Sequence, residues 1–201
     1  KRIPLVDLNY SNINIFPVPI HQFDVNGFDE IQDELIDYAY NLKKKDEGVL
    51  ISNRGGWQSK GFDIINEDDT LQLFLINCLA GFPHIKKSIK LGGHAWININ
   101  KPGNYNVKHV HPTNNLSGVL WIKCSENCGD IVFDSPHNFE SFLEIKSYTD
   151  DFKKSNNIDD SYHFYPTEGR MIIFPSYLMH QVKENKSNED RISVSFNIRL
   201  R

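Results

Sequence analysis

Apolar residues in the first half of the chain recur at the spacing of an α-helix. Between positions 28 and 42 they lie three or four residues apart: Phe28, Ile31, Leu35, Tyr38 and Leu42. Acidic residues at 29–30 and lysines at 43–45 suit the dipole of a helix over this segment. The run "TLQLFLINCLA" predicts a second helix over 70–80, which Gly81 can end.

From residue 94 onward the pattern changes to short alternating runs that are typical of β-strands. These runs cover 94–100, 104–111, 116–123, 130–134, 142–148, 162–166, 170–175, 180–183 and 191–200. The polar run 184–190 predicts a solvated hairpin loop. So many short strands favour a mainly β fold with flanking helices. We expect a double-stranded β-helix, the jelly roll of cupin-like proteins, with the helices packed on one sheet.

Length and composition agree with a single domain over 1–201. In it, 1–90 supply N-terminal strands and supporting helices, and 91–201 form the double-stranded β-helix core. The 201 residues are 39% hydrophobic and carry a formal charge of −4. That charge gives no general attraction to nucleic acid or anionic membrane. No apolar run is long enough to span a bilayer, and no leader-like segment opens the sequence. We expect a cytoplasmic protein that binds neither nucleic acid nor a membrane, and its oligomeric state stays open.

The three cysteines, Cys78, Cys124 and Cys128, lack the spacing of a disulfide framework. Cys124 and Cys128 lie four residues apart, but no further cysteine or histidine follows them at the spacing of a zinc site. Free reduced thiols are therefore the expectation.

Candidate chemistry begins at "KHVHP", where two histidines are separated by one residue. In an extended strand alternate residues share a face. Four side chains are thus predicted to line one side: Tyr105, Val107, His109 and His111. Two imidazoles so placed can bind one metal ion, and two polar residues at a strand end are the alternative. A third imidazole, His180, opens a later short strand.

The last predicted strand has a polar and an apolar face. The polar face carries Arg191, Ser193, Ser195 and Asn197, and the apolar face carries Ile192, Val194, Phe196 and Ile198. The apolar face can pack against the helices, which leaves the polar face toward a cavity or solvent. Arg191 and Ser193 make a fork of donors that suits a carboxylate, with an ordinary surface arginine as the alternative.

The HxH pair, the distal histidine and an R-x-S eleven residues later resemble the Fe(II)- and 2-oxoglutarate-dependent oxygenases. Several segments are similar to a bacterial and phage family of such oxygenases that is related to prolyl hydroxylases: "SNRGGWQS", "AWININKPGNYNVKHVHPTNNLSGVLWI", "GDIVFDSPH", "EGRMIIFPSYLMHQV" and "RISVSFNI". The resemblance implies the double-stranded β-helix, Fe(II), 2-oxoglutarate as cosubstrate and O2. It also implies hydroxylation of an unidentified C–H, in a small molecule or a protein side chain, with release of succinate and CO2. If phage-encoded, the protein would act in the host cytoplasm.

Carried over residue by residue, the resemblance makes His109 and His180 iron ligands. It assigns the distal carboxylate of 2-oxoglutarate to Arg191, Ser193 and the Tyr105 hydroxyl. On the neighbouring strand, Trp96 and Asn98 are expected near the pocket.

The family's usual iron site has two histidines and one carboxylate, whereas His111 stands two residues after His109 here. We interpret this as a three-histidine site of His109, His111 and His180, for which Zn²⁺ is a competitor of Fe(II). Asp134 offers a more remote carboxylate. It would either ligate the metal or, like Asn98, support the site from behind by hydrogen bonding.

The main alternative is a non-catalytic cupin-type protein that binds a metal or a small ligand. Such a protein has no need of Arg191 and Ser193 beside the metal. A zinc-dependent cupin isomerase usually supplies a glutamate shortly after the HxH pair, where this chain has Thr113-Asn114-Asn115. The sequence therefore predicts a dioxygenase whose substrate is open.

Overall fold

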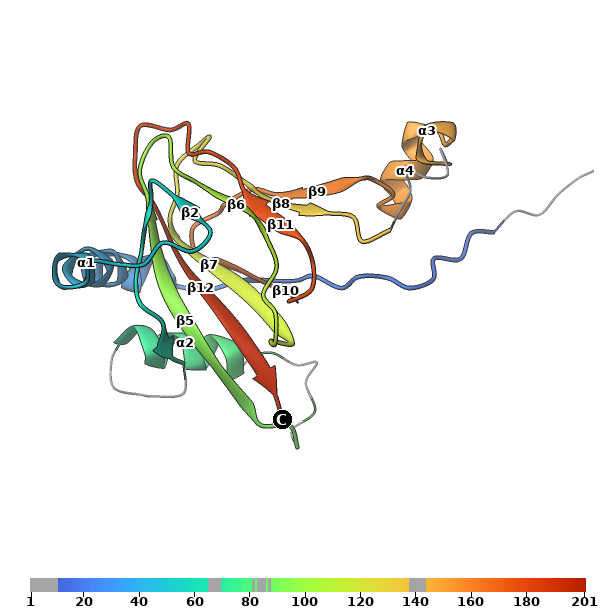
Figure 1. Ribbon diagram of the computed structural model, residues 1–201. Coiled ribbons are helices and arrows are strands. Elements are labelled where there is room, and N and C mark those ends of the chain that lie inside the picture. The colour runs from blue at the N-terminus through green and yellow to red at the C-terminus, as the bar shows by residue number, and fades with distance from the viewer. Residues whose placement is uncertain (1–10, 65–69, 81, 83–85, 87, 138–143) are drawn as a thin grey trace, which may run out of the picture.

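Two antiparallel β-sheets face each other, and two helices cover the outer face of the larger sheet (Figure 1). The computed structural model describes residues 11–64, 70–80, 82, 86, 88–137 and 144–201. This arrangement is the jelly roll of a double-stranded β-helix, so the predicted fold class is confirmed.

The larger sheet has the strand order β1-β10-β7-β12-β5-β3, and β4 also pairs with β5. Its strands are β1 (His21–Asp24), β3 (Trp57–Gln58), β4 (Phe62–Asp63), β5 (Leu91–Asn100), β7 (Leu116–Lys123), β10 (Arg170–Pro175) and β12 (Arg191–Leu200). The long strands β5 and β12 pair along their whole length, from Arg191 opposite Asn100 to Leu200 opposite Leu91. This pair forms the rigid floor of the site described below.

The smaller sheet has the order β2-β6-β11-β8-β9. Its strands are β2 (Asn53–Arg54), β6 (Tyr105–His109), β8 (Ile131–Asp134), β9 (Ser161–Phe164) and β11 (His180–Val182). The predicted strands from 94 onward agree with these elements except at 142–148. Strands β1 to β4, from the first 90 residues, extend both sheets at their edges.

Helices α1 (Asp29–Lys45) and α2 (Thr70–Ala80) occupy the predicted ranges. Their apolar faces pack on the larger sheet in one hydrophobic cluster that contains Leu35, Leu71 and Leu75 with Val194 and Phe196 of β12. The apolar face of β12 therefore points to the helices, as predicted, and its polar face points between the sheets. No helix in the described part of the chain has the length and apolar character that a membrane span requires.

The predicted strand over 142–148 is wrong where the structure describes it. Its described part forms the one-turn helix α3 (Glu144–Ser147), and α4 (Asp150–Asn156) follows it. The Thr149 hydroxyl caps α4 by accepting a hydrogen bond from the backbone N–H of Phe152, and Asn157 ends it in the left-handed conformation. Figure 1 shows both helices beyond the β8–β9 strands, remote from α1 and α2.

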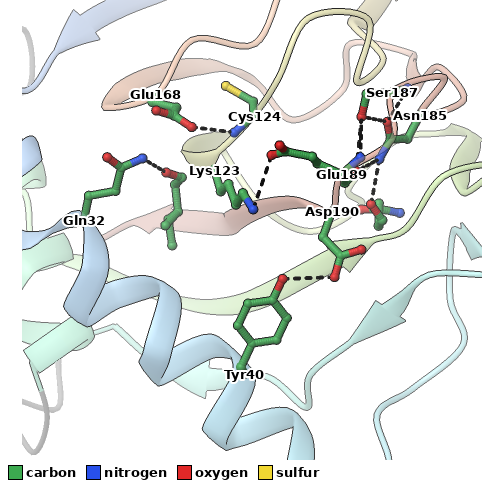
Figure 2. Close-up of polar contacts among 11 residues, drawn as sticks. Gln32, Tyr40, Lys123, Cys124, Glu168, Asn185, Ser187, Glu189 and Asp190 are labelled. Carbon is green, nitrogen blue, oxygen red and sulfur yellow. Dashed lines mark hydrogen bonds and ion pairs between the residues drawn. The ribbon is translucent and has the colours of Figure 1, made fainter.

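The polar run 184–190 is more firmly held than the solvated loop that we predicted. Asn185 is fully buried, and its side-chain amide donates to the carbonyls of Asn100 (2.9 Å) and Glu189 (2.7 Å). The Tyr40 hydroxyl of α1 donates to the Asp190 carboxylate at 3.0 Å (Figure 2). These contacts therefore fix the backbone that leads into β12 at Arg191.

Candidate metal centre

Three imidazoles from the smaller sheet meet between the two sheets. His109 ends β6, His180 opens β11 directly opposite it, and His111 lies two residues beyond β6. The ligand nitrogens of the three rings all lie within 4.8 Å of one another. The ring centroids are 4.4 Å apart for His109–His180, 5.0 Å for His109–His111 and 5.1 Å for His111–His180. The structure thus brings together the three histidines that the sequence analysis singled out.

Backbone carbonyls orient two of these rings. Nδ1 of His109 donates to the carbonyl of Val107 at 2.7 Å, and Nδ1 of His180 donates to that of Leu178 at 2.8 Å. Because a carbonyl can only accept, each neutral ring carries its proton on Nδ1 and leaves the Nε2 lone pair for a metal. The phenyl ring of Phe174 packs against His180 at 4.9 Å and restrains it further.

Burial keeps the three imidazoles uncharged at neutral pH. Desolvation is the largest cause that lowers the pKa of each ring, to about 3 for His111, to about 4 for His180 and below the ordinary value for His109. The neighbouring imidazoles lower the pKa values of His111 and His180 further. Neutral imidazole is the form that ligates metals. Three nitrogens bound at about 2.1 Å to one ion lie about 3 Å apart, so small side-chain rotations would close this cluster around a metal.

A cavity of about 50 Å³ lies beside the imidazoles, and we call it the inner cavity. One water needs about 10–15 Å³ by the same measure, so the inner cavity has room for several small groups. Its polar wall comes from β5 and β12: Trp96, Asn98, Asn100, Arg191, Ser193 and Ser195. The polar face of β12 therefore faces a cavity, not solvent.

Arg191 is the buried cation of the inner cavity, with only 2% of its surface exposed. Its Nη1 donates to the carbonyls of Cys128 (2.6 Å) and Gly129 (2.9 Å), with a longer contact to Lys183 (3.4 Å). Within the described residues, Nε and Nη2 make no hydrogen bond and no carboxylate pairs with the guanidinium. Desolvation lowers the pKa of Arg191 to about 10, which leaves it charged at neutral pH. One edge of the guanidinium is fixed and the other can receive an anion.

Gly129 permits this placement of Arg191. Its φ of +92° lies where side-chain-bearing residues are rare, and a Cβ there would meet the Lys183 carbonyl oxygen at 2.2 Å and Arg191 Nη1 at 2.8 Å. Only glycine lets the backbone approach the guanidinium so closely.

Asn98 lines the inner cavity, and no hydrogen bond between described residues joins its side chain to an imidazole. Its side-chain amide donates to Ser195 Oγ at 3.0 Å. Its Oδ1 is buried and has no hydrogen-bond partner within the described residues. A buried acceptor at a cavity wall is costly unless a donor in the cavity satisfies it. Asn98 and Trp96 therefore lie at the pocket, as expected, and the Asn98 amide bonds to Ser195, not to a metal ligand.

The prediction that Tyr105 shares a face with His109 is wrong. His109 pairs with His180 and Asn106 with Val182, so three residues of β6 advance while β11 advances two. This β-bulge changes which residues point inward. Asn106 and His109 both line the inner cavity, whereas Tyr105 is 42% exposed and is absent from its wall. Strand alternation alone could not reveal Asn106, whose amide donates to Ser52 Oγ at 3.1 Å.

Asp134 does not support the imidazoles either. Its carboxylate forms an ion pair with Lys108, and it lines neither side of the cluster. The Nδ1 atoms of His109 and His180 donate to backbone carbonyls instead. Among the described residues, no carboxylate joins the three histidines. The expectation of a supporting role for Asp134 is therefore wrong.

Solved structures share this fold at low sequence identity. A prolyl-4-hydroxylase from Pseudomonas putida is similar with a TM-score of 0.64 and 13% identity over 92% of this chain and 94% of that one. A prolyl hydroxylase from Trichoplax adhaerens, in complex with a hypoxia inducible factor peptide fragment, has a TM-score of 0.60 and 12% identity over 89% and 82%. HygX from Streptomyces hygroscopicus, with nickel and 2-oxoglutarate bound, has a TM-score of 0.53 and 10% identity over 90% and 82%.

No curated protein sequence matches the chain. A family model described as "Putative 2OG-Fe(II) oxygenase" matches residues 94–197, which is more than half of the chain. The matched segment contains the three clustered histidines as well as Arg191 and Ser193. The chain therefore belongs to this 2OG-Fe(II) oxygenase family, whose cofactors are Fe(II) and the cosubstrate 2-oxoglutarate, with O2 as oxidant.

Proposed function

We propose that the protein is a dioxygenase that hydroxylates a substrate C–H and releases succinate and CO2. In this proposal His109, His111 and His180 hold Fe(II), and Arg191 with Ser193 binds the distal carboxylate of 2-oxoglutarate. One observation carries it: three neutral imidazoles converge beside a cavity whose wall contains a buried arginine with an unpaired edge.

When bound, Fe(II) supplies the activation of O2, for which the oxidative decarboxylation of 2-oxoglutarate provides electrons. The protein's own contribution is binding and geometry. The imidazoles approach from the smaller sheet and leave the side toward β5 and β12 open for the cosubstrate. Arg191 fixes the far end of the cosubstrate and neutralises its charge in a site from which water is largely excluded.

Apolar side chains complete the wall of the inner cavity. They come from both sheets: Val119, Trp121, Ile131, Phe174 and Val182. These residues limit access of water to the reacting atoms and strengthen the electrostatic contact at Arg191. The similar prolyl hydroxylases, at 12–13% identity, support the fold and do not identify a substrate.

Anaerobic reconstitution with Fe(II) and 2-oxoglutarate tests the proposal. We expect the weak visible charge-transfer band of the metal–cosubstrate chelate, followed by succinate release when O2 is admitted. His109→Ala should lose metal binding, and Arg191→Met should lose the band while it still binds metal. His137→Ala, which removes an exposed imidazole outside the cluster, is the matched control and should behave as wild type.

Two results would contradict the proposal. Metal binding that survives His109→Ala but disappears in Arg191→Met would reverse the assigned roles. A protein that binds the metal but forms neither the chelate band nor succinate would be the non-catalytic cupin-type alternative.

A further inference from the structure

A second cavity, of about 600 Å³, adjoins the same imidazoles, and we call it the outer cavity. Its wall shares Ser52, Trp96, His109 and His111 with the inner cavity. The two cavities therefore meet at the candidate metal centre. Binding sites for small molecules enclose roughly 300–1,000 Å³, and the outer cavity falls within that range.

Much of the outer cavity wall is apolar. The apolar side chains come from the segment after α1 and from the end of β6: Val49, Ile51, Val107, Val110 and Pro112. The indole of Trp96 adds an aromatic surface, 5.8 Å from the His111 ring and 5.6 Å from the His94 ring. This wall suits the hydrocarbon part of a ligand.

The charged residues in the outer cavity wall are both cationic. They are Lys60 and Arg199, and the wall includes no aspartate or glutamate. Asp46 accepts a hydrogen bond from the backbone N–H of Lys60, and Asp63 lies opposite His94 on β4, but neither carboxylate is part of the wall. In a chain whose formal charge is −4, a cavity lined by positive charge alone favours an anion.

One hydrogen bond orients the solvent-exposed side chain of Arg199. Its Nε donates to Asn114 Oδ1 at 3.2 Å. The turn that carries Asn114 is fastened to β12, because the backbone N–H of Leu200 donates to Asn115 Oδ1 at 2.9 Å. Thr113 in this turn has φ +68°, which is rare for a β-branched residue and occurs mainly where surrounding structure enforces it. Within the described residues, Arg199 has no carboxylate partner and its two terminal nitrogens make no hydrogen bond.

Arg191 and Arg199 stand at the two ends of one row of side chains. Alternate residues of β12 form this row, which runs through Arg191, Ser193, Ser195, Asn197 and Arg199. Arg191 lies at the inner cavity, Arg199 lies at the outer cavity, and Ser195 pairs with Trp96 between them. Arg199 lies four residues along the strand from Ser195, which is about 13 Å at the usual rise per residue. The Arg199 side chain can extend over part of this distance, and a ligand in the outer cavity would cover the rest.

We propose that the outer cavity binds the substrate and that this substrate is a small organic anion. This inference rests on the proposed function. Its apolar body lies against Val49, Val107 and Trp96. Its carboxylate or phosphate pairs with Arg199, and the C–H to be hydroxylated lies at the imidazoles. Arg199 is then a specificity-determining residue, with Lys60 adding positive potential.

Three probes with the same body test this inference: 3-phenylpropionate, 2-phenylethyl phosphate and the uncharged 3-phenylpropanamide. Their dissociation constants would be measured by saturation-transfer NMR with Zn²⁺ in place of Fe(II) and saturating 2-oxoglutarate, which prevents turnover. We expect at least one anion to bind roughly tenfold or more tightly than the amide, as one charge-assisted contact provides. Arg199→Gln should reduce this preference to within about twofold, and Arg199→Lys should keep part of it.

Lys154→Gln is the matched control, because it removes one exposed positive charge from α4, away from both cavities. It should leave the preference unchanged. The inference is overturned if neither anion binds, if acid and amide bind equally, if the preference survives Arg199→Gln, or if Lys154→Gln reduces it as much.

The two proposals fail separately in these experiments. Loss of the chelate band and of succinate formation in wild type would refute the dioxygenase proposal. The Arg199-dependent preference for anions is measured by binding alone, without oxygen or turnover. A wild type that forms succinate but shows no such preference would retain the dioxygenase function and refute the anionic substrate.

Discussion

Arg191→Lys gives a sharp test of how the cosubstrate is anchored. Arginine uses two edges here: Nη1 donates to the carbonyls of Cys128 and Gly129, while Nε and Nη2 remain for a ligand. The single ammonium of lysine keeps the charge but cannot serve both sides at once. It should therefore lose about one charge-assisted hydrogen bond to 2-oxoglutarate, about 1.5–3 kcal/mol, which raises the dissociation constant roughly ten- to a hundredfold.

Titration calorimetry of 2-oxoglutarate into the Zn²⁺-loaded protein measures this change, and metal binding should be unaffected. The carbonyls of Cys128 and Gly129 lose hydrogen bonds in this variant. This loss should lower the free energy of unfolding by about 1–3 kcal/mol and Tm by roughly 2–10 °C for a chain of this size. Arg170→Lys, at a partly exposed arginine paired with Asp24, is the matched control and should change neither quantity appreciably. A folded Arg191→Lys protein that binds 2-oxoglutarate within about twofold of wild type would refute the reasoning.

Four further variants probe the site. His111→Ala should abolish metal binding and Asp134→Ala should leave it intact, as measured by titration calorimetry. The reverse result would indicate that Asp134 is a metal ligand and His111 is not. Gly129→Ala, with a Cβ 2.2 Å from the Lys183 carbonyl oxygen, should cost about 2 kcal/mol or more and lower Tm by roughly 4–8 °C. It should also weaken 2-oxoglutarate binding, and unchanged stability would contradict the close approach. Tyr105→Phe should leave the affinity for 2-oxoglutarate unchanged in the same titration, and a tenfold loss would place the hydroxyl back in the site.

Local patterns in the sequence were sufficient for much of the architecture. The ranges of α1 and α2 follow from apolar spacing and charge at the ends, and the two faces of β12 follow from strict alternation. The three clustered histidines could be chosen because two lie in one short motif and the third precedes R-x-S by a fixed interval.

Features that depend on pairing between strands were not predictable in this way. The bulge in β6 exists only relative to β11, so nothing in the sequence of β6 alone indicates that Asn106 faces inward in place of Tyr105. The ion pair with Lys108 that occupies Asp134 likewise needs the fold. For α4 a local signal was present, in Thr149 before Asp150 and Asp151, but the apolar alternation over 142–148 misled the assignment of the preceding segment.

The carbonyls of Val107 and Leu178 that fix the His109 and His180 rings also bear on how this centre tolerates mutation. In many metalloproteins a carboxylate side chain accepts the hydrogen bond from the ligand histidine, and a single codon change can remove that side chain. A main-chain oxygen is present whatever amino acid is encoded at 107 or 178. Random drift at those two positions can alter packing, yet it cannot delete the acceptor itself, so the two rings keep their tautomer through sequence divergence.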